Sequence, residues 1–245
     1  MLLILNVIVG GLVGILINYL SDVLPATRRF TRPVCKGCDH PYSVRDYLML
    51  NNCSQCGTGR SKRSFFVVII AILICILLDY FPFSSLSFWA TLPILIFLGV
   101  IVVIDIEHRV VLIETSIFGF VLFLVYGIIL NGLARTIMGG LVGFLITILF
   151  YLLGIAYVKI AGKLRHQVID EVAFGFGDVL AGTFLGLLLG WPSVFGAIII
   201  AIFTFGAYSL IYIVTLLVSK RYNAFSTALA FTPFLVLGTV VLFYL

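Results

Sequence analysis

The chain has 245 residues, of which 62% are hydrophobic and 10% are charged, and its mean hydropathy is +1.26. So little polar surface cannot cover a water-soluble globule of this length, which excludes a single soluble domain. The formal net charge of +5 does not by itself indicate nucleic acid, because a basic excess in a membrane protein usually marks its cytoplasmic loops. We therefore expect an all-α polytopic protein in a lipid bilayer, without a nucleic-acid partner.

Eight apolar runs follow one another along the chain, each near the length that a hydrocarbon core of about 30 Å requires. The expected spans are 2–20, 65–81, 86–104, 113–131, 136–158, 177–191, 193–218 and 226–245. The first run has no basic n-region and no small-residue cleavage site, so we expect it to remain as the first span. Three segments result: span 1–20, a polar loop 21–64, and a seven-helix membrane domain 65–245.

Lys and Arg predict the orientation of these spans, because positive loops resist translocation. Fourteen of the 15 basic residues fall on one side of this alternating topology, and only Arg135 falls on the other. Loop 21–64 alone holds eight of them. The sequence therefore predicts that this loop faces the cytoplasm and that both termini are extracytoplasmic.

Two C-x-x-C pairs lie in this loop, Cys35 with Cys38 and Cys53 with Cys56, separated by 14 residues. This spacing is typical of a zinc ribbon with four thiolate ligands. Two disulfides are the alternative, but the cytoplasm is a reducing compartment. A closed four-thiolate shell leaves no position for a catalytic water, so the predicted zinc is structural.

The rest of the loop is expected to support these two knuckles. Gly37 and Gly57 would permit their tight turns, while Tyr47, Leu48 and Leu50 would fill a small core. Asp22, in the same loop, is expected to be solvated.

Two aspartates lie at span edges on the predicted cytoplasmic side, where carboxylates near hydrocarbon are expensive and tend to be functional. Asp105 closes the third span, and Asp178 opens the sixth after Gly175 and Gly177. If brought together, the two acids would share a proton, one acting as base toward a water and the other polarising a peptide carbonyl. The glycines would let an extended substrate strand approach. This pattern predicts an aspartyl protease.

Each acid also has a structural interpretation. Asp178 suits a helix N-cap, and Asp105 suits an ion pair with Arg109 one turn further on. Glu114 and Glu171 are expected either to tune the acidic pair or to bind a basic substrate segment. His108 and His166 are expected to be interface residues.

The order of these parts resembles the type IV prepilin leader peptidases, the Gly-x-Gly-Asp family of membrane aspartyl proteases. Four segments carry the resemblance: Gly11–Asn18 with the exit Leu24-Pro25, then Asp105–Arg109 with Glu114, then Glu171–Val179, and finally Thr232-Pro233-Phe234 with Gly238. The cysteine knuckles come where the family has them. Ala230 and Thr232 depart from the family's terminal Pro-Phe-Gly-Pro signature.

The resemblance implies an aspartic endopeptidase of the bacterial inner membrane with Asp105 and Asp178 as its catalytic pair. Its substrate would be a type IV prepilin or pseudopilin, whose short basic leader is cut at the cytoplasmic face. Family members with a cysteine-bearing loop often also N-methylate the new terminus with S-adenosylmethionine. Two alternatives remain: a presenilin-like intramembrane protease, against which the cysteine loop argues, and a transporter or receptor whose two aspartates line an ion path.

Overall fold

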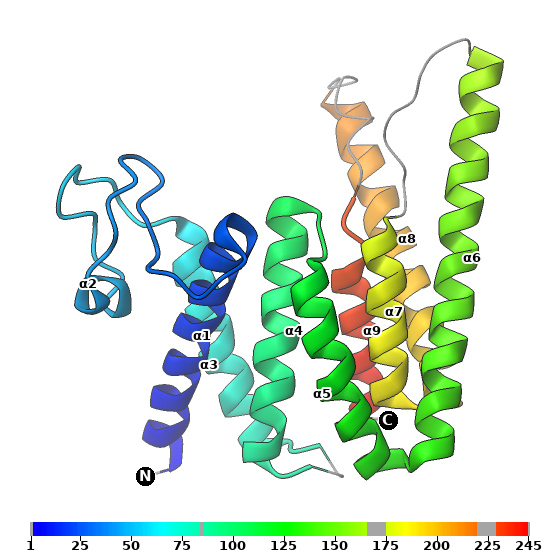
Figure 1. Cartoon of the computed structure of the whole chain (residues 1–245), viewed down its shortest axis with the longest axis horizontal. Helices are drawn as coiled ribbons and strands as arrows, with labels where there is room; N and C mark the ends of the chain where they lie inside the picture. Colours follow the sequence, from blue (N-terminus) through cyan, green and yellow to red (C-terminus); the bar gives the residue numbers. More distant parts are fainter. Residues whose placement is uncertain (1, 84–85, 166–174, 220–228, 245) are drawn as a thin grey trace. The chain divides into compact units, whose positions relative to one another are not determined.

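The computed structural model describes residues 2–83, 86–165, 175–219 and 229–244. Within these ranges the regular structure is helical, with a single β-bridge between Val34 and Pro41, so the all-α prediction is confirmed. The helices are α1 (Leu2–Thr27), α2 (Val44–Leu48), α3 (Lys62–Tyr80), α4 (Phe88–His108), α5 (Ile113–Asn131), α6 (Leu133–Arg165), α7 (Phe176–Leu189), α8 (Ser193–Val218) and α9 (Thr232–Tyr244) (Figure 1).

Six of these helices, α1, α3, α4, α5, α6 and α8, are long and apolar enough to cross a membrane. The multi-pass membrane character is therefore confirmed. The other two predicted spans, 177–191 and 226–245, correspond to the apolar helices α7 and α9, which have only 14 and 13 residues. At a rise of about 1.5 Å per residue they are some 20 Å long, well short of a core of about 30 Å.

Both short helices have a polar residue in their first turn, within an apolar stretch of the sequence. Asp178 is in the first turn of α7, and Thr232 is the first residue of α9. The first amides of a helix lack intrahelical partners and need polar groups nearby. Mean hydropathy does not register this requirement, so the apolar run 226–245 did not show that α9 begins at Thr232.

The first helix continues about two turns beyond the predicted end at residue 20, and past the expected exit at Leu24-Pro25. Val23 in this extension is buried, and the Thr27 hydroxyl donates a hydrogen bond of 3.1 Å to its carbonyl. The helix ends at Arg28, whose φ of 53° is left-handed and whose N–H still donates to Leu24 O.

The chain divides into two compact units, residues 1–104 and 105–245. In the first unit α1 packs closely along α3, because Gly10 and Gly14 have no side chain to separate the helices. A Cβ on Gly14 would lie 2.7 Å from the Cα of Val68. Small residues of this kind let membrane helices approach backbone to backbone.

In the second unit α7 packs against α5, α6 and α9 (Figure 1). Its contact with α6 is made by glycines spaced four apart on both helices, Gly139 and Gly143 against Gly182 and Gly186. A Cβ on Gly143 would lie 2.2 Å from the carbonyl oxygen of Gly182, and one on Gly186 would lie 2.4 Å from that of Gly139. This glycine contact fixes α7, and with it the residues of its first turn.

Candidate active site and metal centre

Asp178 is held by hydrogen bonds to both of its carboxylate oxygens. It is buried, with an exposed fraction of 9%, at the third position of α7 after the N-cap Gly175. Its Oδ2 accepts the Gly175 N–H at 3.1 Å, and its Oδ1 accepts the hydroxyl of Thr232 at 2.9 Å. One oxygen thus stabilises the start of the helix from its third position, with Gly175 and not Asp178 as the N-cap, while the other faces α9.

Asp105 is buried in the last turn of α4, with an exposed fraction of 5%. Among the described residues it forms no ion pair with Arg109, whose backbone N–H donates to the Asp105 carbonyl at 2.9 Å. Within the same part of the chain, its Oδ2 is buried without a hydrogen-bond partner. The Asp105 carboxylate interacts electrostatically with Asp178, so two acids far apart in the sequence lie in one site.

Thr232 donates a hydrogen bond to Asp178 and lies near Asp105. It is fully buried at the first position of α9, and its hydroxyl and backbone lie beside both carboxylates. The N-terminus of a helix carries a partial positive charge, which favours a nearby carboxylate. The sequence predicted no role for Thr232 in the site, although it lies in the segment that resembles the family's terminal signature. The available signal was a polar residue next to Pro233 at the start of an apolar run, a position typical of a helix N-terminus.

The other predicted site residues lie at helix ends or outside the described part of the chain. Glu114 is exposed in the first turn of α5, and His108 Nε2 lies 3.8 Å from Glu107 Oε2 at the end of α4. Glu171 and His166 lie outside the described residues.

The two glycines before Asp178 have different roles. A Cβ on Gly177 would lie 2.8 Å from the Cβ of Val111, so this position must be glycine for the start of α7 to approach the segment after α4. A Cβ on Gly175 would meet nothing closer than 3.7 Å, the Oδ2 of Asp178.

We therefore expect Gly177→Ala to destabilise the protein by about 1 to 3 kcal/mol, the usual cost of overpacking. For a chain of this size, that lowers Tm by about 2–4 °C per kcal/mol. The measurement is thermal unfolding in detergent, with Gly175→Ala as the matched control. Equal Tm values for the two variants would contradict this interpretation of Gly177.

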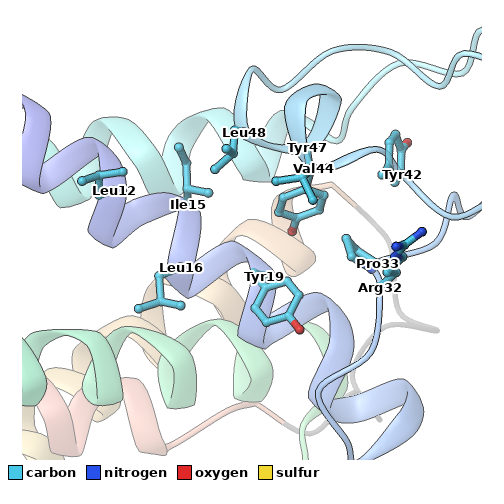
Figure 2. Close-up of a pocket in the computed structure, with 10 residues that line it drawn as sticks. All are labelled: Leu12, Ile15, Leu16, Tyr19, Arg32, Pro33, Tyr42, Val44, Tyr47 and Leu48. Carbon is cyan, nitrogen blue, oxygen red and sulfur yellow. The ribbon is translucent and has the colours of Figure 1, made fainter.

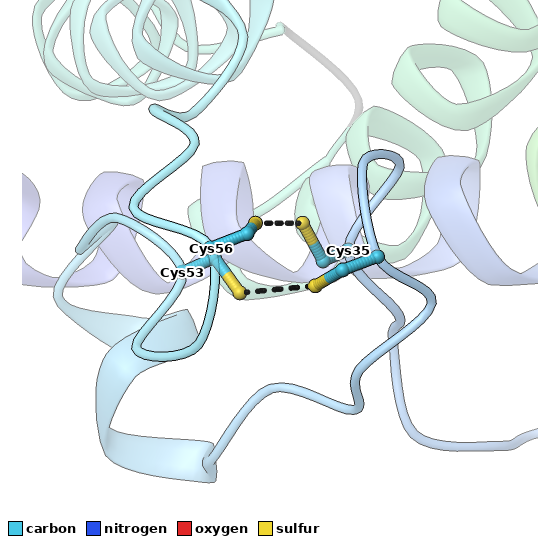
Figure 3. A group of neighbouring side chains, drawn as sticks. Cys35, Cys53 and Cys56 are labelled. Atoms are coloured by element: carbon cyan, nitrogen blue, oxygen red, sulfur yellow. Dashed lines mark hydrogen bonds between the residues drawn. The ribbon is translucent and has the colours of Figure 1, made fainter.

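The four loop cysteines form a metal-binding arrangement (Figure 3). All their Sγ atoms lie within 4.8 Å of one another, and the pairs Cys35–Cys56 and Cys38–Cys53 are 3.6 Å apart. Tetrahedral zinc with Zn–S bonds of about 2.3 Å requires sulfurs about 3.8 Å apart. All five cysteines of the chain are free thiols. The distances between the sulfur atoms thus suit a structural zinc ion. The free thiols do not agree with the alternative of two disulfides.

The two knuckles are built alike, and the predicted role in the turn is confirmed for Gly57 but not for Gly37. Asp39 and Gly57 follow the second cysteine of each knuckle, and both have left-handed φ values, 55° and 68°. Gly37 serves close approach instead, since its Cβ would lie 3.0 Å from Thr58 Oγ1. The Thr58 hydroxyl lies 3.0 Å from Cys56 Sγ, and its hydrogen bonds lower the pKa of the Cys56 thiol to about 6. A lowered pKa favours the thiolate form, which is the form that binds metal.

Aromatic residues and one acid join the loop to the end of α1. Asp22 accepts the Tyr47 hydroxyl at 2.7 Å and is ion-paired with Arg63, so the prediction that it is solvated is wrong. Burial, and then the Asp22 charge, raise the pKa of Tyr47 above its ordinary value, which keeps the hydroxyl a donor. The Arg60 guanidinium lies 4.0 Å from the Tyr47 ring centroid. Leu48, expected in the small core, is instead 46% exposed.

Fold and site together define a polytopic all-α membrane protein with two buried carboxylates at helix ends. Residues 92–210 match the model of the type IV leader peptidase family, so this part of the chain is similar to a family of proteases, in agreement with the predicted resemblance. The matched range contains Asp105 and Asp178; the cysteine loop and Thr232 lie outside it. No curated protein and no solved structure matches the chain.

Proposed function

We propose that the protein is a membrane aspartic endopeptidase that removes the basic leader of type IV prepilins or pseudopilins. The observation that carries the proposal is the pairing of Asp105 and Asp178 around Thr232 in a buried site. Buried carboxylates at close range cannot both ionise easily, and a shared proton is the condition that aspartic proteases use.

In the proposed reaction a water bound between the acids attacks the scissile carbonyl carbon. One carboxylate takes a proton from this water, while the other carboxyl group donates its proton to the carbonyl oxygen, giving a neutral tetrahedral diol. Proton transfer to the leaving amine then breaks the C–N bond. Because the pair titrates as a unit, neither acid is assigned a fixed role. The Asp105 Oδ2, unpartnered among the described residues, is the oxygen best placed to bind the water.

We further propose that cleavage takes place at the cytoplasmic face of the bacterial inner membrane, with both termini extracytoplasmic. The distribution of Lys and Arg supports this orientation. The acids near this end, Glu107 and Glu114, are exposed at the end of α4 and the start of α5. Their charge is suited to a basic leader, and Glu171 is proposed to act with them.

A single assay tests the proposed reaction. Purified protein is incubated with a precursor that has a basic leader ending in Gly, and the products are weighed by mass spectrometry. A cut directly before the apolar helix supports the proposal. A cut deep within that helix would favour the presenilin-like alternative, and ion flux through proteoliposomes without any cleavage would favour a transporter.

The assay is also run with S-adenosylmethionine, because the resemblance implies N-methylation of the new terminus. The described residues give this second activity no support of their own. A pocket beside the cysteine loop is lined by Arg32 and by no acidic residue, which does not suit a sulfonium cation. We therefore derive no methylation step. A mass increase of one methyl group on the mature product would establish the activity.

Thr232 is proposed to position Asp178 during catalysis. We expect Thr232→Val to lower kcat about 10- to 100-fold, since a hydrogen bond to a charged group contributes about 1.5–3 kcal/mol. Thr232→Ser retains the hydroxyl and should recover most of the activity, and KM should change little in either variant. Equal kcat for the Val and Ser variants would show that the hydroxyl has no such role.

A further inference from the structure

A pocket of about 280 Å³ lies beside α1 in the first unit, and it is not part of the proposed catalytic site. Its apolar wall comes from two helices, α1 with Leu12, Ile15 and Leu16, and α2 with Val44 and Leu48 (Figure 2). Apolar cavities of about 150 Å³ stay free of water and take up small hydrocarbons. The pocket is therefore suited to an apolar ligand.

The pocket extends along α1 toward the end of that candidate membrane span. Leu12 and Leu16 are 58% and 40% exposed within the span, so a bilayer would surround them with hydrocarbon. From Leu12 to Tyr19 the helix rises by about 10 Å, which is most of one leaflet of a hydrocarbon core about 30 Å thick. The space thus runs from acyl-chain depth to the membrane interface.

A cation lies at the interfacial end of this space. Figure 2 shows Arg32 at the opposite end of the pocket from Leu12. Arg32 is exposed, and in the part of the chain that the structure describes it forms no ion pair. Loop 21–64 around it carries eight basic residues and three acidic ones. Guanidinium groups bind phosphate oxygens through paired hydrogen bonds, so this end complements an anionic phosphate.

We propose that the pocket is a specific site for an anionic phospholipid such as phosphatidylglycerol. One acyl chain lies against Leu12, Leu16 and Leu48, and Arg32 holds the phosphate. Polybasic segments beside a membrane span attract anionic lipids in general, but this pocket adds a defined place for a single lipid molecule. Bound there, the lipid would hold α2 and the cysteine loop against α1.

The test is native mass spectrometry of the full chain with phosphatidylglycerol or phosphatidylethanolamine carrying the same acyl chains. The wild type is expected to retain one phosphatidylglycerol in preference to the zwitterionic lipid. Arg32→Gln should reduce that preference about fivefold, since a basic residue near the surface contributes about 1 kcal/mol. Leu16→Trp, which fills the apolar end, should weaken binding of both lipids.

Arg45→Gln is the matched control, because Arg45 is an exposed basic residue of the same loop that does not line the pocket. It should leave the lipid preference unchanged. An equal loss in the Arg45 and Arg32 variants would overturn the proposal, because diffuse attraction to the basic loop would then explain the binding. Cross-linking of a precursor's apolar helix at position 16, with no retained lipid, would overturn it in favour of substrate docking. Zinc content measured on every variant confirms that the loop remains folded.

Discussion

Asp105→Asn is expected to lower the rate of leader removal by about 10²- to 10⁴-fold, the usual contribution of a positioned acid or base. The amide that replaces the carboxyl group cannot share a proton with Asp178, while its size and burial are nearly unchanged. The protein should therefore still insert in the membrane and unfold at a similar temperature. The measurement is the initial rate of precursor cleavage in detergent or proteoliposomes.

Asp178→Asn should abolish cleavage as well, but its interpretation is less direct. The Asp178 carboxylate accepts one hydrogen bond from the Gly175 backbone and one from Thr232. An Asn side chain has a single oxygen, so it can satisfy only one of these donors. A lower Tm is therefore expected for this variant alone. Asp46→Asn, in the cysteine loop, is the matched control, and wild-type cleavage by Asp105→Asn would contradict the proposed pair.

The double variant Cys35→Ser, Cys53→Ser is expected to lose the metal and the fold of the cysteine loop. Structural zinc contributes about 10–16 kcal/mol of apparent binding free energy in small domains, and this energy is folding energy. The loop has little else to hold it together, since Tyr42 and Tyr47 are the buried aromatic residues beside these two cysteines. Zinc per chain should fall from about one to near zero, and limited proteolysis should cut within residues 29–61.

The membrane helices should remain protected in that experiment, because α1 and α3 pack on each other independently of the metal. Cys75→Ala is the control, since Cys75 is buried in α3 away from the cluster. Stoichiometric zinc in the double variant would contradict the four-thiolate assignment. Chelation of the wild type should reproduce the proteolytic pattern of the double variant.

The helices and the cysteine cluster were predicted well, because each depends on residues close together in the sequence. Apolar runs of sufficient length predicted the helices, because a membrane span must satisfy its own backbone hydrogen bonds. The cysteine cluster was predicted from its spacing, because each knuckle supplies two ligands within four residues. In both cases the determining interactions are local.

Features that depend on packing between distant segments were not predictable from patterns alone. Nothing in the sequence near Asp105 indicates that Thr232 lies beside it, and the pairing of the acids was predicted from their common side of the membrane and from the family resemblance. The extension of α1 beyond residue 20 has a similar cause, because Asp22 accepts the Tyr47 hydroxyl and Val23 is buried. The start of α9 at Thr232 likewise accompanies a contact with a distant residue, the hydrogen bond to Asp178.

The glycine contact between α6 and α7 has a consequence for how this protein can change. Where two backbones touch, even one added methyl group has no space. We therefore expect substitutions to be excluded at Gly139, Gly143, Gly182 and Gly186. Laboratory evolution toward new leader sequences is thus expected to leave these four positions unaltered. Adaptive substitutions should accumulate instead on α5 and in the segment that joins it to α4, where side chains such as Ile113 are exposed.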